Sequence, residues 1–172
     1  MSSENHVKLN VFHIGGGDED IGPTNVLLKL EGVDVDLYIF EIIDDDGYTT
    51  LDRFKNRPNV SANIVPYGVG EIDGEVVNFR VNKHSLSSSV LPGSSLTGHN
   101  NPDYDWCDDW AENTALDTTF EATLRSIDAL VASGEVPSPD FLSMDIQGLE
   151  LAAMRGGSSA LAQTVLGIVT ES

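Results

Sequence analysis

A glycine-rich segment with acidic neighbours is the first place in this chain where chemistry could occur. Residues 11–14 form an apolar run, and the segment after it contains, in order, Gly15, Gly16, Gly17, Asp18, Glu19 and Asp20. Val26, Leu27 and Leu30 then have the spacing of a helix. This order is typical of α/β domains that bind a nucleotide or cofactor, because glycines let the backbone approach a ligand and a helix N-terminus offers amides. We expect a binding site at this loop, and the alternative is a tight turn without a ligand.

The acidic residues of the loop restrict the kind of ligand. Phosphate groups would meet carboxylates such as that of Asp18 at close range, and like charges repel strongly in a partly desolvated pocket. A cationic or zwitterionic cofactor therefore fits better than a pyrophosphate. The irregular glycine spacing also disfavours a nicotinamide-dependent enzyme, which is the third hypothesis for this chain.

Acidic side chains also follow the other expected strands. Glu41, Asp145 and Glu171 each stand at or near the end of an apolar run. Ligands of doubly wound sheets gather outside the carboxyl ends of the strands, so these side chains are candidates for the same site. Glu41 follows Gly15 by about the interval at which a carboxylate accepts both hydroxyls of a ribose, and this role is predicted for it.

Three residues could accept a proton from a substrate. Asp145 and Glu150 lie near one strand end, and His84 precedes a serine-rich segment. A carboxylate or histidine within hydrogen-bond reach of a hydroxyl can take its proton, so we predict these three as catalytic candidates. Glu150 also suits the start of a helix, and His84 also suits the surface. We expect no metal site, because solvated acidic loops explain the remaining acid clusters better.

The elements that would position these residues alternate between strands and helices. We expect buried strands at residues 11–14, 35–43, 60–67, 141–146 and 165–170, and helices at 26–30, 48–55 and 149–155. This alternation predicts an α/β fold in which a mainly parallel sheet carries helices on both faces. Residues 77–81 instead alternate like a half-exposed strand after a turn, which predicts an antiparallel excursion.

Two later segments are less regular. Residues 85–116 are rich in serine, glycine, asparagine and aspartate, which predicts a long loop or lid. Residues 119–133 fit a helix, but they also fit a strand that ends at Ser126 before a short helix. We favour the strand followed by the helix.

Composition narrows the cellular setting and the partners. The 172 residues suit one domain, and 9 basic against 28 acidic residues give a formal net charge of -19. So acidic a protein lacks the basic patch that nucleic acid or an anionic membrane surface requires. No run is long and apolar enough for a membrane span, and the N-terminus lacks the pattern of a secretion signal. Cys107 is the single cysteine, so we expect no disulfide within the chain and a cytoplasmic location.

One block of the sequence resembles a known family. Residues 141–151 read Phe-Leu-Ser-Met-Asp-Ile-Gln-Gly-Leu-Glu-Leu, and residues 154–157 read Met-Arg-Gly-Gly. Together they are similar to the signature of FkbM-type S-adenosylmethionine-dependent methyltransferases, in which a hydrophobic strand leads into Asp-x-Glu/Gln-Gly-x-Glu and a helix. Residues 123–130 and 65–70 resemble two further stretches of that family. The resemblance covers most of residues 8 to 171.

This resemblance implies a class I methyltransferase fold, which is Rossmann-like, with S-adenosylmethionine over the first loop. Gly15, Gly16, Gly17 and Asp18 would face the cofactor, Glu41 would bind its ribose, and Asp145 would stand beside the sulfonium. The family's first loop commonly begins with aspartate, whereas His13 holds that position here. The implied reaction is methylation of an oxygen of a small molecule or a sugar.

The resemblance also makes the length of the chain informative. Class I methyltransferases add an antiparallel pair of strands after the fifth strand, and this chain ends inside or just after that strand. We therefore expect either a fragment or a short form that lacks part of that sheet edge, and loss of catalysis is one of the alternatives for such a form. The rival hypothesis is a non-catalytic cofactor-binding or scaffold module with the same fold, favoured by His13. The sequence indicates neither the identity of the acceptor nor the oligomeric state.

Overall fold

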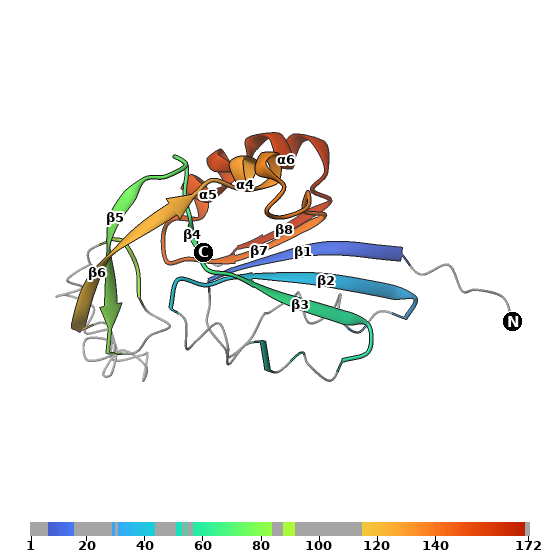
Figure 1. The fold of residues 1–172 in the computed structure, drawn as a ribbon, viewed down its shortest axis with the longest axis horizontal. Coiled ribbons are helices and arrows are strands. Elements are labelled where there is room, and N and C mark those ends of the chain that lie inside the picture. The colour runs from blue at the N-terminus through green and yellow to red at the C-terminus, as the bar shows by residue number, and fades with distance from the viewer. Residues whose placement is uncertain are drawn as a thin grey trace, which may run out of the picture.

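The core of the protein is a five-stranded parallel sheet, shown in Figure 1. The computed structural model describes residues 7–15, 29, 31–43, 51–52, 54, 57–83, 88–91 and 115–170. The sheet has the order β3-β2-β1-β7-β8, and all four pairings are parallel. Its strands are β1 (Val7–Gly15), β2 (Val33–Phe40), β3 (Val60–Val65), β7 (Phe141–Asp145) and β8 (Gly167–Thr170). This arrangement confirms the predicted α/β class and the mainly parallel sheet.

Among the residues that the structure describes, three short helices cover one face of this sheet. They are α4 (Ile127–Ser133), α5 (Glu150–Gly156) and α6 (Ser158–Gln163), which lie together above the sheet in Figure 1. Their apolar side chains pack with those of one sheet face, including Phe12, Ile14 and Leu142. The opposite face holds a second cluster around Val11, Leu37, Ile39 and Phe54. Residues 51–52 and 54 are helical, within the helix predicted at 48–55.

A second, smaller sheet stands beyond the carboxyl ends of the parallel strands. It has the order β4-β6-β5, with β4 (Gly68–Val69) parallel to β6 (Leu116–Arg125) and β5 (Val76–Asn82) antiparallel to it. The antiparallel pair of β5 and β6 is called the hairpin below, although residues 83–115 separate the two strands in the sequence. In Figure 1 it is at the left, at the end where β1, β2 and β3 finish. The predicted antiparallel excursion is therefore confirmed, and the hairpin covers the edge of the sheet where ligands were expected.

The strand-then-helix interpretation of residues 119–133 is also confirmed. β6 ends at Arg125, and Ser126 follows as the N-cap of α4. The Ser126 hydroxyl accepts a hydrogen bond from the Ala129 amide at 3.2 Å, which satisfies one of the amides that a helix start leaves without a partner.

Several predicted boundaries were wrong for identifiable reasons. The strand predicted to reach residue 43 ends at Phe40, because the Glu41 carboxylate takes the amides of Ile42 and Ile43. The strand predicted to reach residue 67 ends at Val65, where Pro66 supplies no amide. Leu116 belongs to β6 and not to the predicted 85–116 loop.

Other predictions fall wholly or partly outside the structure. Residues 85–87 and 92–114 of the predicted loop lie outside the described residues, as does most of the predicted helix at 26–30. None of the described helices is long and apolar enough to cross a membrane.

Candidate functional site

A pocket lies at the carboxyl edge of the parallel sheet. Gly15 at the end of β1, Asp145 at the end of β7 and Glu41, which directly follows β2, belong to its lining. The hairpin supplies Phe79 from β5 and Leu124 from β6. The pocket is thus bounded by the strand ends on one side and by the hairpin on the other. The sheet order places β1 between β2 and β7, so the direction in which successive strands are added reverses at β1. Such a switch point is where α/β sheets bind ligands.

Position 15 requires glycine for two reasons, its backbone conformation and its close contact with β7. Its φ of 72° lies in the left-handed region, where L side chains are strained. Gly15 pairs with Asp145 in the parallel register, and a Cβ at Gly15 would come within 2.3 Å of the Asp145 carbonyl oxygen. The two strand ends therefore meet in a contact that only glycine permits.

The Glu41 side chain turns back on the chain that follows it. Its Oε1 accepts hydrogen bonds from the amides of Ile42 at 2.8 Å and Ile43 at 3.0 Å. The Glu41 amide donates to the Val65 carbonyl of β3 at 3.2 Å. Local backbone contacts therefore fix this carboxylate at the edge of the pocket.

The Asp145 carboxylate is held by a neighbouring side chain. Gln147 Nε2 donates a hydrogen bond to Asp145 Oδ1 at 2.8 Å. Gln147 has a φ of 50°, in the left-handed region that non-glycine residues rarely occupy. Backbone strain of this kind persists only where the surroundings fix the conformation, and it is common at functional sites.

Two further residues fix the turn that carries Gln147. Glu150 Oε1 accepts the amides of Ile146 at 3.2 Å and Gly148 at 3.1 Å. The Ser89 hydroxyl donates to the Gln147 carbonyl at 3.0 Å and accepts the Leu91 amide at 3.1 Å. Ser89 also exchanges two backbone hydrogen bonds with Arg80 of β5. The turn after β7 is therefore tied through Ser89, 58 residues from Gln147 in the sequence, to β5.

His13 lies beside the site but points away from it. Its neighbours in register are Ile39 on β2 and Ser143 on β7, and alternation along β1 places its ring on the sheet face opposite α4, α5 and α6. The side chain is 2% exposed, and neither ring nitrogen has a hydrogen-bond partner among the described residues. Burial lowers the pKa of His13 from 6.5 to about 4. His13 is therefore neutral at physiological pH.

The predicted site residues come together in part. Gly15, Glu41 and Asp145 all line one pocket, although they stand far apart in the sequence. Glu150 is placed at the start of α5, where its carboxylate supports the turn after β7. Gly16, Gly17, Asp18 and His84 lie outside the described residues.

Sequence reasoning missed several lining residues. Tyr67, Phe79 and the segment 88–90 line the pocket, and none of them was a candidate. The alternation of residues 77–81 did place Phe79 on one face of a half-exposed strand, which could have indicated it. No local pattern marks Ser89, because its partner Gln147 is distant in sequence.

The charge of the lining is acidic. Glu41 and Asp145 are carboxylates, and the described lining residues include no lysine, arginine or histidine. The rest of the described lining is mainly apolar, with Phe40, Ile42, Leu124 and Leu149 among its members. Such a surface favours a ligand that carries positive charge and apolar area over a phosphate ester.

Comparison with known proteins bears on the same residues. The family model described as Methyltransferase FkbM domain matches residues 35–172, and this match confirms the resemblance seen in the sequence. It includes Glu41, Asp145 and the hairpin. No curated protein and no solved structure matches the chain.

Proposed function

Because the chain belongs to the FkbM methyltransferase domain family, we propose that it transfers a methyl group from S-adenosylmethionine to an oxygen of a small molecule or a sugar. The observation that carries the proposal is the convergence of Gly15, Glu41 and Asp145 on one pocket without a basic residue in its described lining. A sulfonium compound is cationic, and carboxylates stabilise it where they would repel a phosphate.

The residues present fit the cofactor. The Gly15 backbone has no side chain to keep a ligand from the strand ends, and a Cβ there would meet Asp145. Glu41 lies at the end of β2, and we assign its carboxylate to the ribose hydroxyls. We assign Asp145 to the positively charged part, because it ends β7 beside Gly15. Gly16, Gly17 and Asp18 would extend this contact along the first loop.

The chemistry requires positioning and the removal of one proton. The cofactor supplies an electrophilic methyl group on sulfur. The pocket would hold an acceptor hydroxyl in line with it, and alignment of this kind supplies much of the acceleration in a direct displacement. The hydroxyl proton must also leave, and Asp145 is the lining carboxylate that we propose to accept it. His84 and Glu150 are the alternative bases, although in this conformation Glu150 binds two backbone amides.

The lining also bears on the acceptor. Apolar residues of the hairpin and of the segment after β2 occupy much of the described wall, including Phe79, Leu124 and Ile42. Phosphorylated or carboxylated acceptors would find no cation among the described lining residues. An uncharged hydroxyl compound is therefore the acceptor that we propose.

Calorimetric titration of the full chain with S-adenosylmethionine tests the proposal. We expect binding that the Asp145→Asn variant weakens, and methyl transfer that this variant reduces by about 100-fold or more. Asp117→Asn is the matched control, because Asp117 is exposed on β6 and does not line the pocket. Absence of binding at millimolar cofactor to folded protein would refute the proposal.

A second candidate is a non-catalytic module that binds the cofactor without turnover. His13 favours it, because a buried neutral ring stands where the resembled family commonly has an acid. Radiolabelled methyl transfer against cell extracts separates the two candidates. Cofactor binding without transfer in any extract would support the module.

A further inference from the structure

The guanidinium of Arg125 lies over the ring of Tyr67, one of the residues that line the pocket. Arg125 is the last residue of β6, and its Cζ lies 5.1 Å from the centroid of the Tyr67 ring. Tyr67 lines the pocket together with Glu41 and Asp145, whereas Arg125 does not line it. A guanidinium over an aromatic face is attracted by the ring's quadrupole and restricts the orientation of the ring.

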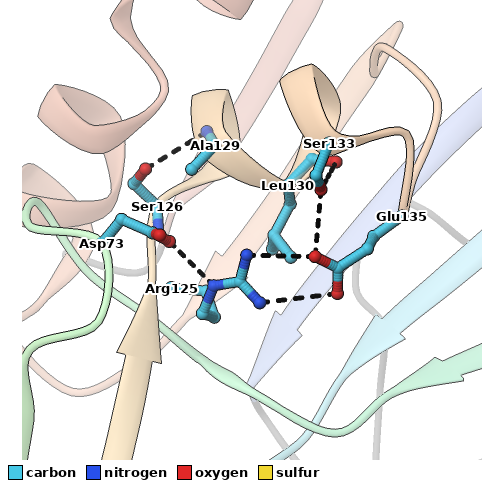
Figure 2. A network of polar contacts seen from close by, with 7 residues as sticks. All are labelled: Asp73, Arg125, Ser126, Ala129, Leu130, Ser133 and Glu135. Carbon is cyan, nitrogen blue, oxygen red and sulfur yellow. Dashed lines mark hydrogen bonds and ion pairs between the residues drawn. The ribbon is translucent and has the colours of Figure 1, made fainter.

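The Arg125 side chain is itself fixed by two carboxylates, shown in Figure 2. Its Nε donates to Asp73 Oδ1 at 2.8 Å, and its terminal nitrogens donate to the two oxygens of Glu135 at 3.1 and 3.4 Å. Asp73 Oδ1 also accepts the Ser126 amide at 3.1 Å, and Ser133 donates to Glu135 Oε1 at 3.0 Å. The guanidinium plane is therefore set by contacts from both of its edges.

This network joins three parts of the fold. Asp73 lies in the turn between β4 and β5, Arg125 ends the hairpin, and Glu135 follows the end of α4. Hydrogen bonds from Arg125 lower the pKa of Asp73 and the pKa of Glu135, and the carboxylates raise the pKa of Arg125. All three groups therefore remain charged near neutral pH, which keeps the guanidinium in place.

The backbone of Tyr67 is fixed independently of the network. Its amide donates to the Val65 carbonyl at 2.8 Å across Pro66, so the direction of the Tyr67 Cα–Cβ bond at the end of β3 is fixed. What this contact does not fix is the plane of the ring. The ring also packs against the apolar core on the helix-covered face of the sheet, and among the parts of the chain that the structure describes Arg125 is the charged residue over the ring face.

We propose that Arg125 is a positioning residue, which sets the plane of the Tyr67 ring as a stacking surface for the flat heteroaromatic part of the cofactor. This assignment rests on the proposed function. A ring held in one plane stacks on a flat ligand at a smaller entropic cost than a ring that turns. Asp73 and Glu135 act through Arg125 and have no contact with the ligand.

A double-mutant cycle on the full chain tests this proposal. The variants are Arg125→Met, Tyr67→Leu and the two combined, and the readouts are the calorimetric Kd for S-adenosylmethionine and the thermal midpoint by circular dichroism. We expect Arg125→Met to raise the Kd about fivefold when Tyr67 is present and to leave it unchanged in the Tyr67→Leu background. Tyr67→Phe keeps the ring and should lose less affinity than Tyr67→Leu.

Lys8→Met is the matched control. Lys8 forms an ion pair with Asp36 at 2.7 Å at the start of β1, away from the pocket lining, and its removal should change neither the Kd nor the coupling. If Arg125→Met does not fold, Arg125→Lys replaces it in the same cycle, because lysine keeps the charge and loses the planar fork.

The outcomes separate the two proposals. An equal rise of the Kd in both backgrounds would show that Arg125 does not act through Tyr67, and it would overturn the assignment. A lower thermal midpoint with an unchanged Kd would also overturn it, because Arg125 would then serve only the fold. Wild-type protein that binds no cofactor would refute the proposed function and this assignment with it.

Discussion

Glu41 and Asp145 both follow a parallel strand and both line the pocket, but the protein holds them in different ways. The Glu41 carboxylate binds the amides of the next two residues, so its support is local. Asp145 depends on Gln147, whose strained turn is tied to Ser89 of a distant segment. A local turn can form without the rest of the site, whereas the surroundings of Asp145 exist only in the complete fold. We therefore expect changes near Asp145 to affect stability and ligand binding together.

Gly15→Ala should have the largest effect, because it breaks the junction between the end of β1 and Asp145. A methyl group there would meet the Asp145 carbonyl at 2.3 Å and would also strain a backbone with φ of 72°. We expect a loss of more than about 3 kcal/mol in the free energy of unfolding, measured by urea denaturation.

Gly32→Ala is its control. Gly32 has the same φ of 72°, but a Cβ added there would meet no atom within 4 Å, so only the conformational cost of about 1 kcal/mol should be observed. Equal losses in the two variants would show that the contact with Asp145 costs nothing.

His13, on β1, should make the free energy of unfolding depend markedly on pH. Its pKa is about 4 in the folded protein and 6.5 in the unfolded chain, so the unfolded chain binds the proton first as the pH falls. The contribution to stability is complete above about pH 6.5 and is lost toward pH 4, by about 3 kcal/mol. Urea denaturation from pH 7.5 to 4 measures it.

The difference between wild-type protein and His13→Leu isolates this histidine from the other titrating groups. We expect a shallower loss of stability with acid in the variant. Identical slopes in the two proteins would contradict the lowered pKa.

Ser89→Ala should affect the surroundings of Asp145 alone, because it removes the distant support of Asp145 and leaves Glu41 untouched. The hydroxyl donates to the Gln147 carbonyl and accepts the Leu91 amide, so we expect a loss of about 1 kcal/mol together with weaker cofactor binding. Ser159→Ala, at an exposed position of α6, is the control and should change neither quantity. A loss of stability with unchanged cofactor affinity would show that the turn after β7 does not influence cofactor binding.

Glu41→Gln should have the smallest effect on stability. A glutamine oxygen can still accept the amides of Ile42 and Ile43, so the free energy of unfolding should change by less than about 0.5 kcal/mol. The charge is lost, however, and the calorimetric Kd for S-adenosylmethionine should rise. A large loss of stability would show that the turn needs the full carboxylate charge.

The sequence predicted those features that depend on neighbouring residues. Apolar runs located the five parallel strands, and the Ser126 cap separated β6 from α4. The rule that ligands gather at carboxyl strand ends brought Gly15, Glu41 and Asp145 to one pocket, as the structure has them.

Features that depend on distant partners could not be predicted. The helix α6 was missed because two glycines suggested an end, whereas Asp128 of α4 accepts the amides of Ser159 and Ala160 and so starts a new helix. Its acceptor lies about 30 residues away. The contact of Arg125 with Tyr67 could not be predicted from the sequence for the same reason, since it depends on how the hairpin packs against the end of β3.

The pairing of β1 with β7 has a consequence for the order of assembly. β1 and β2 pair within the first 40 residues, but the Asn10 amide meets the Asp140 carboxylate across 130 residues of chain. Closing so long a loop has a high entropic cost and slows folding. The junction of Gly15 with Asp145 therefore cannot form until the chain has been synthesised through residue 145, and the pocket that both residues line is completed by contacts between distant parts of the sequence.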